Sequence, residues 1–289
     1  METTVTKQDI EVRTHQTIIE PPHGLADLGL DEVWAYRELL FFLVWRDVKV
    51  RYKQTALGLL WVVLQPLMSM VIFSFLFGNL LKVESGNVPY PIFNYAALLP
   101  WNYFASSLRR SSTGVVNSRH LITKVYFPRL VIPISGVLSG LVDFGVAFLV
   151  LVGLMIYFGI APTAAVALLP GFIVLAALTA LGFGLWLSAL NVRYRDVQHL
   201  VPYLVQVWMY VTPVVYGTTL IPERFRFLLA LNPMTGVTEG FRWALLGNRL
   251  ADAQPPGSLF AISIGIAAAV LAGGFIFFRH TERTFADII

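Results

Sequence analysis

Residues that could carry out covalent chemistry are sparse in this 289-residue chain. Ser139 and Asp143 share a helix face at i, i+4, but all five histidines lie outside the apolar segments and none completes a nucleophilic site. The chain has no cysteine, no His-Glu-x-x-His metal motif and no Gly-x-x-x-x-Gly-Lys-Ser/Thr phosphate loop. We therefore expect a protein that is not an enzyme and that holds no metal or cofactor of its own.

Asp143 is the acidic residue that falls deep inside an apolar segment, 130–158. A charged side chain at the centre of a bilayer costs about 3 kcal/mol or more unless it is paired or hydrated. Two interpretations remain open: contact with a coupling ion or substrate, or a structural bond to a Ser or Tyr on a neighbouring helix. The predicted spans contain no Lys, Arg or His to extend a proton relay, which favours the structural role.

Two apolar segments carry polar and aromatic side chains at helical spacing. Trp61 and Gln65 share a face of segment 56–81, and Tyr203, Gln206 and Tyr210 share a face of segment 200–216. Such side chains can stack on sugar rings and bond hydroxyl groups, although aromatic stripes more often serve packing. Two roles remain open for these side chains: anchoring the packing of helices, or together lining one passage.

The elements that position these residues are predicted to be membrane-spanning helices. Hydrophobic residues make up 56% of the chain and charged residues 13%, against about 25% charged in soluble domains. Since a span needs about 20 apolar residues, the sequence predicts an all-α integral membrane protein with six transmembrane helices. The predicted spans cover about 56–81, 92–108, 130–158, 164–190, 200–216 and 258–278. Pro100 is expected to kink or shorten the second span, and Gly182, Gly184 and Ser188 to allow close packing of the fourth.

Four further segments are expected outside the spans. Residues 31–53 predict an amphipathic interface helix that lies along the membrane, although a soluble helix packed on a partner also fits the pattern. Residues 115–126 are long enough for a short cytosolic helix. Residues 222–246, interrupted at Asn232 and Pro233, predict a re-entrant helical pair or a surface hairpin, with Thr235 as a helix N-cap. Residues 1–30 are polar and predict a cytosolic arm.

The distribution of Lys and Arg predicts the orientation. With the amino terminus inside, 16 of the 21 Lys and Arg residues fall in cytosolic segments. This bias places both termini in the cytoplasm and attributes the net charge of +4 to the membrane topology rather than to nucleic-acid binding.

Three segments carry a resemblance to a known family. They are RYKQTALGLLWVVLQP at 51–66, NVRYRDVQHLVPYLVQVWMYVTPVVY at 191–216 and NPMTGVTEGFRWALLG at 232–247. In this order and spacing they resemble the permease subunits of ABC-2 type exporters. Within that family the chain resembles permeases that export bacterial surface polysaccharides such as O-antigen, capsule and teichoic acid. The resemblance runs from about residue 31 to the carboxyl terminus.

The resemblance implies a function and a set of partners. The expected protein is a multi-pass permease of the bacterial inner membrane that moves a lipid-linked polysaccharide outward from the cytoplasmic side. It implies a homodimer in contact with membrane lipids and with two copies of a separate ABC ATPase subunit, on which ATP and Mg²⁺ bind.

The resemblance also implies roles for particular residues. Expected contacts with the ATPase, from a coupling helix within 115–126 and from the connection 191–199, are Arg119, His120, Lys124, Arg193, Arg195 and Asp196. Expected passage residues are Trp61, Gln65, Tyr203, Gln206 and Tyr210. The expected outer gate, within the re-entrant segment, includes Phe225, Asn232, Pro233, Glu239 and Arg242.

Other functions remain open at this point. An ABC-2 exporter of a drug or small lipid shares the fold. An ion-coupled secondary transporter or channel needs no motor, but the sequence shows no paired intramembrane charges and no inverted repeat. The arm 1–30 has no role in the resemblance, and we hypothesise that it packs against the ATPase or the glycan-synthesis machinery.

Overall fold

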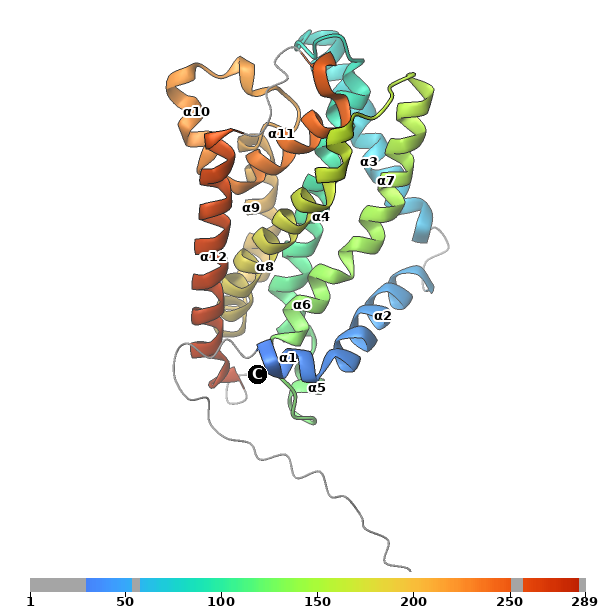
Figure 1. Cartoon of the computed structure of the whole chain (residues 1–289). Helices are drawn as coiled ribbons and strands as arrows, with labels where there is room; N and C mark the ends of the chain where they lie inside the picture. Colours follow the sequence, from blue (N-terminus) through green and yellow to red (C-terminus); the bar gives the residue numbers. More distant parts are fainter. Residues whose placement is uncertain (1–29, 54–57, 251–256, 286–289) are drawn as a thin grey trace, which may run out of the picture.

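The computed structural model describes residues 30–53, 58–250 and 257–285, and this part of the chain is built from helices (Figure 1). The expected arm 1–30 lies almost wholly outside the described residues. The α-helices are α1 Leu30–Ala35, α2 Arg37–Lys53, α3 Gly58–Phe73, α4 Tyr90–Asn117, α5 Arg119–Ile122, α6 Val131–Leu138, α7 Gly140–Tyr157, α8 Leu169–Arg193, α9 Val197–Val211, α10 Glu223–Ala230, α11 Pro233–Leu246 and α12 Ser258–Glu282. A π-helical segment, Ser74–Leu80, continues α3, and short 3₁₀ turns cover Ala164–Leu168, Thr218–Leu220 and Gly247–Arg249.

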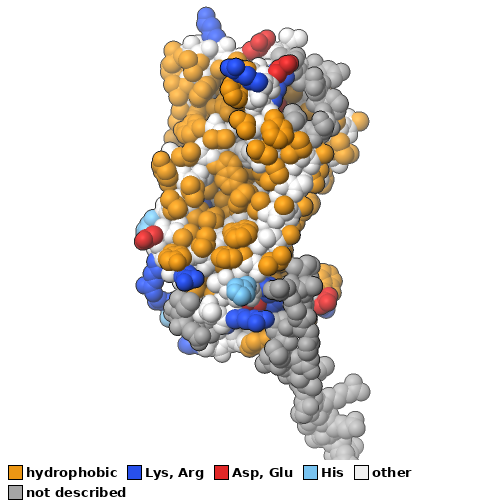
Figure 2. All heavy atoms as spheres, turned by 90° about the vertical axis from the view of Figure 1, so that its left-hand side faces the viewer, with side chains coloured by type: hydrophobic (Ala, Val, Ile, Leu, Met, Phe, Trp, Pro, Cys, Tyr) orange, Lys and Arg blue, Asp and Glu red, His pale blue; other side chains and the backbone are white. Residues whose placement is uncertain are grey.

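Four helical stretches of the described chain are long and apolar enough to cross a membrane. They are Leu60–Leu80, Val131–Tyr157, Ala164–Arg193 and Phe260–Glu282. Figure 2 shows hydrophobic side chains over the middle of one side of the molecule and charged side chains toward its two ends. The all-helical membrane architecture is therefore confirmed, and these four stretches correspond to the first, third, fourth and sixth predicted spans.

The other two predicted spans, 92–108 and 200–216, correspond to helices of a different character. The second is part of α4, which is long but polar. The fifth is α9, whose 15 residues extend about 22 Å, short of a hydrocarbon core of about 30 Å.

Helix α4 lies at the centre of the molecule, against α3, α6, α7, α8, α9 and α11 (Figure 1). Tyr95, Trp101 and Phe104 are fully buried on it. Pro100 does not end the helix, which continues to Asn117 instead of stopping near residue 108. Pro100 is itself buried, and neighbouring helices rather than lipid surround the backbone there, so the missing hydrogen bond is tolerated.

Helix α8 approaches its neighbours closely through glycine. An added Cβ on Gly274 of α12 would lie 2.5 Å from the carbonyl oxygen of Gly182, and one on Gly182 would lie 2.9 Å from the backbone of Leu271. Gly184 faces Ser111 of α4, where a Cβ would collide with the serine hydroxyl. The expected close packing of the fourth span therefore uses Gly182 against α12 and Gly184 against α4.

The two ends of the molecule are covered by short helices. At the lower end in Figure 1, α1 and α2 occupy residues 30–53, and α2 contacts α6 and α3. Residues 115–126 are not one helix, because α4 continues to Asn117 and α5 makes a single turn at Arg119–Ile122.

At the opposite end, α10 and α11 form a helical pair that meets at Asn232. The Asn232 side chain accepts a hydrogen bond from the Met234 backbone at 3.1 Å and caps α11. The prediction of Thr235 as N-cap is wrong, because Pro233 has no N–H to satisfy and suits the first helical position, which moves the cap to Asn232.

The α8–α12 contact predicts the effect of a single methyl group. Gly274→Ala should destabilise the protein by about 1–3 kcal/mol, because backbone rather than a flexible side chain must move. Gly265→Ala, in the same helix, adds its Cβ to open space and should leave stability unchanged or slightly raised. Thermal unfolding in detergent measures both variants, and equal melting temperatures would contradict this account of the contact.

Candidate functional site

A cluster of charged side chains joins the interface helix to the membrane core. Asp143 lies in the first turn of α7, and its Oδ2 forms an ion pair with Arg51 near the end of α2. The Tyr52 hydroxyl donates to Asp143 Oδ1 at 2.5 Å. Burial, followed by the hydrogen bond to Asp143, raises the pKa of Tyr52 to about 12, so its hydroxyl keeps its proton at neutral pH. The end of α2 is thereby attached to α7.

Arg110 of α4 is the third partner of Asp143, with Nη1 3.4 Å from Oδ2. Its other nitrogens are also occupied: Nε donates to the Gly136 carbonyl at 3.0 Å, and Nη2 donates to the Ser106 hydroxyl at 3.1 Å. The guanidinium fits there because Gly140 has no side chain, and a Cβ at that position would collide with it. Arg110 therefore connects α4, α6 and α7.

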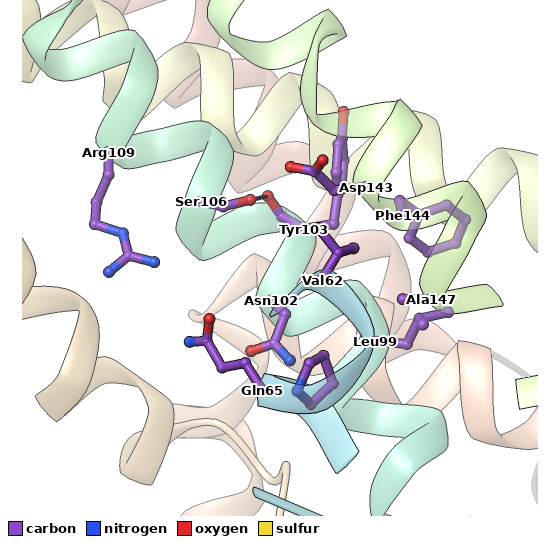
Figure 3. Close-up of a pocket in the computed structure, with 11 residues that line it drawn as sticks. Val62, Gln65, Leu99, Asn102, Tyr103, Ser106, Arg109, Asp143, Phe144 and Ala147 are labelled. Atoms are coloured by element: carbon purple, nitrogen blue, oxygen red, sulfur yellow. Dashed lines mark hydrogen bonds between the residues drawn. The ribbon is translucent and has the colours of Figure 1, made fainter. Parts of the chain in front are cut away.

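A cavity of about 130 Å³ lies beside this cluster, between α3, α4 and α7 (Figure 3). Its apolar walls are Val62, Pro66, Leu99, Tyr103, Phe144 and Ala147, and its polar residues are Gln65, Asn102, Ser106, Arg109 and Asp143. Gln65, an expected passage residue, thus meets Asp143, an expected intramembrane polar residue, in one cavity. The sequence analysis did not single out Asn102, Ser106 or Arg109 for this site.

The remaining expected passage residues lie on exposed faces of α3 and α9. Trp61 is 51% exposed, Tyr203 64% and Tyr210 52%, and Gln206 is also exposed. Both helices pack against α4. None of these four residues lines the cavity that holds Gln65.

Trp208, on the same helix as Tyr203 and Tyr210, faces inward. Its ring meets those of Trp101, Phe104 and Phe183 edge-on, and its indole nitrogen donates to Asn232 Oδ1 at 3.0 Å. Sequence spacing could have revealed this residue, because Val201, Val205 and Trp208 follow the buried face of α9. Trp208 therefore belongs to the packing face of α9, whereas Tyr203 and Tyr210 belong to its exposed face.

At the opposite end of the molecule, Arg242 of α11 is completely buried. It pairs with Glu239 at 2.9 Å, donates to the carbonyls of Phe93, Val214 and Tyr216, and stacks on the Phe93 ring at 4.0 Å. Arg242 was expected in the outer gate; in the structure it is a buried anchor that joins α11, α4 and the segment after α9.

The other expected gate residues do not share the ion pair of Arg242 and Glu239. Asn232 caps α11 and also donates to Thr212 Oγ1 at 2.8 Å, and Pro233 begins the helix. Phe225, on α10, is half-exposed, and the Arg224 guanidinium stacks on its ring at 4.7 Å.

The expected ATPase contacts are all exposed and lie toward the lower end in Figure 1. Arg119 and His120 begin α5, and Lys124 follows it. Arg193 ends α8, and Arg195 and Asp196 lie in the connection to α9. The structure thus brings the two expected contact segments to one end of the molecule.

The Asp143 cluster predicts a measurable coupling. Asp143→Asn should destabilise the protein by about 1–3 kcal/mol, because Arg51 and Arg110 then face each other without the carboxylate. Adding Arg51→Gln to Asp143→Asn should cost much less than Arg51→Gln alone, a non-additivity measured by thermal unfolding of the single and double variants. Asp47→Asn is the control, because its partner Arg46 is 42% exposed. Additive effects would mean that Asp143 and Arg51 do not interact.

Comparison with known proteins identifies the family of this chain. A family model described as ABC-2 type transporter matches residues 38–246. The O-antigen export system permease protein RfbA of Myxococcus xanthus is 34% identical over 260 residues, which cover 89% of this chain and 98% of that protein. RfbA of Klebsiella pneumoniae is 32% identical across 71% of this chain and 79% of its own length. The polysialic acid transport protein KpsM of Escherichia coli is 22% identical across 72% and 81%. The resemblance read from three sequence segments is therefore confirmed, and this multi-pass membrane protein belongs to the ABC-2 type transporter family.

Proposed function

We propose that this chain is the permease subunit of an ATP-driven exporter that moves a lipid-linked polysaccharide across the bacterial inner membrane. The cargo is of the O-antigen, capsule or teichoic acid type and enters from the cytoplasmic side. The observation that carries the proposal is the pair of exposed polar aromatic faces on α3 and α9, in a chain whose relatives are named for O-antigen export and polysialic acid transport.

A passage is the role that suits these two faces. Gln65 and Gln206 are exposed amides, which hydrocarbon would not accept, and Trp61, Tyr203 and Tyr210 offer ring surfaces beside them. Stacking on sugar rings tolerates many sugars without binding any one tightly, as movement of a polymer requires. Because these faces lie on the outside of a single chain, we propose that a second copy encloses them in a homodimer.

The proposed topology has six spans. Helices α4 and α9 join the four apolar spans, since neighbouring helices cover the polar side chains of α4. The α10–α11 pair forms the re-entrant segment, and α2 lies along the membrane surface with Phe41, Phe42 and Trp45 exposed to lipid. The bias of Lys and Arg supports a cytoplasmic location of both termini.

The motor is proposed to be a pair of ABC ATPase subunits that bind ATP and Mg²⁺. They dock at the lower end in Figure 1, where two exposed segments present the expected contacts. These contacts are Arg119, His120, Lys124, Arg193, Arg195 and Asp196. At the outer end, α10 and α11 close the passage, and Phe225 is the exposed member of the proposed gate whereas Glu239, Arg242, Asn232 and Pro233 hold its frame.

Two alternatives fit less well. An exporter of a drug or small lipid explains the fold but does not need exposed stripes on two helices. An ion-coupled transporter centred on Asp143 conflicts with its surroundings, since two guanidinium groups and a tyrosine hydroxyl already occupy the carboxylate.

Charge reversal tests the motor contact. Arg119→Glu with Lys124→Glu should lower the ATP turnover of the permease–ATPase complex in nanodiscs about tenfold, as expected for a lost electrostatic contact of about 1.4 kcal/mol. Lys82→Glu reverses one exposed charge outside both expected contact segments, in the connection that follows Ser74–Leu80, and should leave turnover unchanged. The contact is wrong if both variants copurify with the ATPase and turn over ATP like the wild type.

Removal of aromatic rings tests the passage. Tyr203→Ala with Tyr210→Ala should lower polysaccharide export in cells several-fold, because each stacking contact contributes about 0.5–1.5 kcal/mol. Folding and ATP turnover should remain close to wild type, because both rings are more than half exposed. Tyr157→Ala, at an 81% exposed tyrosine on α7, is the matched control. Unchanged surface polysaccharide in the double variant would exclude these rings from the passage.

A further inference from the structure

Arg109 and Arg110 are neighbours in sequence but differ in their surroundings. Arg110 is saturated by Asp143, Gly136 and Ser106. The Arg109 side chain lines the cavity between α3, α4 and α7, and within the described residues it forms no hydrogen bond or ion pair. Successive helix residues point about 100° apart, so one arginine faces the protein core and the other faces the cavity.

The cavity also holds further hydrogen-bond donors beside Arg109. In Figure 3 the Gln65 amide and the Arg109 guanidinium point toward each other across the cavity, with Asn102 beside Gln65. Neither amide has a hydrogen-bond partner in the described part of the chain. A guanidinium and two amides supply N–H groups suited to the oxygen atoms of an anion.

The charge of the region favours an anion as well. Arg51 and Arg110 share a single carboxylate, Asp143, and Arg109 lines the same cavity, which leaves an excess of positive charge. Arg109 and Gln65 are both exposed, so an anion can reach them from outside the chain. A volume of about 130 Å³ holds several water molecules, and a phosphate group can take their place.

The position of the cavity indicates the kind of phosphate. It lies between α3 and α7, which both belong to membrane-spanning stretches, so a ligand reaches it alongside lipid. Gln65 also belongs to the exposed face of α3 that carries Trp61, so the cavity adjoins the proposed passage. A phosphate that joins a glycan to its lipid has the charge, the size and the location that this cavity requires.

We propose that Arg109, with Gln65 and Asn102, binds the phosphate linkage between lipid and glycan in the lipid-linked substrate. This proposal rests on the proposed function and deepens it, because it assigns the lipid headgroup to a particular cavity. Arg110, Arg51 and Asp143 are positioning residues that hold the cavity wall. The glycan then extends from the cavity toward the aromatic faces of α3 and α9.

The experiment measures binding of radiolabelled undecaprenyl diphosphate to the full-length permease in nanodiscs without the ATPase. Arg109→Gln should raise the Kd at least about tenfold, because it removes a charge-assisted hydrogen bond. Arg109→Lys, which keeps the charge, should recover part of the affinity. Lys49→Gln removes one exposed charge from α2 and should leave the Kd unchanged. Undecaprenol, which lacks the diphosphate, should bind all variants equally weakly.

Competition distinguishes the sources of the anion. Unlabelled undecaprenyl diphosphate should compete, and sodium diphosphate or phosphatidylglycerol at the same concentration should not. Competition by sodium diphosphate would identify a free anion as the ligand, and competition by phosphatidylglycerol would identify any anionic lipid; either result overturns the proposal. A wild-type Kd in Arg109→Gln also overturns it.

Failure of this proposal differs from failure of the proposed function. The binding assay contains no ATPase, so its result does not depend on motor coupling. If the permease copurifies with an active ATPase and exports polysaccharide but Arg109→Gln binds normally, the headgroup site is wrong and the exporter stands. If no ATPase or export is found, the proposed function itself is wrong.

Discussion

The burial of polar side chains on α4 is the constraint on which the arrangement of the other helices depends. Asn94, Ser107 and Ser111 of α4 are buried within protein, and Arg110 is only partly exposed. Helices α3, α6, α7, α8, α9 and α11 surround α4 and shield these polar side chains from the outer surface. The four apolar stretches can therefore form the outer surface while the polar helix stays at the centre.

Two arginine clusters attach the ends of the molecule to this core. Toward one end, Asp143 joins α2, α4 and α7 through Arg51 and Arg110. At the other end, Arg242 joins α11 to α4 and to the segment after α9. Breaking a buried pair leaves an uncompensated charge, so each cluster holds a short surface helix firmly to α4. Both ends of the molecule are therefore attached to the same helix.

Sequence patterns predicted the parts of this structure that depend on local composition. Four spans followed from apolar length, and the glycines at 182 and 184 indicated close packing. The Asp143 cluster was not predictable in the same way, because Arg51 and Asp143 are 92 positions apart and Arg110 lies beyond the predicted end of the second span at 108. A basic residue near a predicted boundary carries no local sign of whether the helix continues past it. The buried position of Arg242 was missed because its carbonyl partners lie 26 to 149 positions away in the sequence.

The adjacent arginines of α4, Arg109 and Arg110, have different surroundings. An arginine placed among membrane helices is costly unless it is paired or hydrated. Arg110 meets this condition through Asp143, and it needs Gly140 to make room. Arg109 lines a cavity whose Gln65 and Asn102 amides form no hydrogen bonds within the described chain. Because Arg109 is exposed, its guanidinium is solvated from outside the chain and can exchange that solvation for the oxygen atoms of an anion.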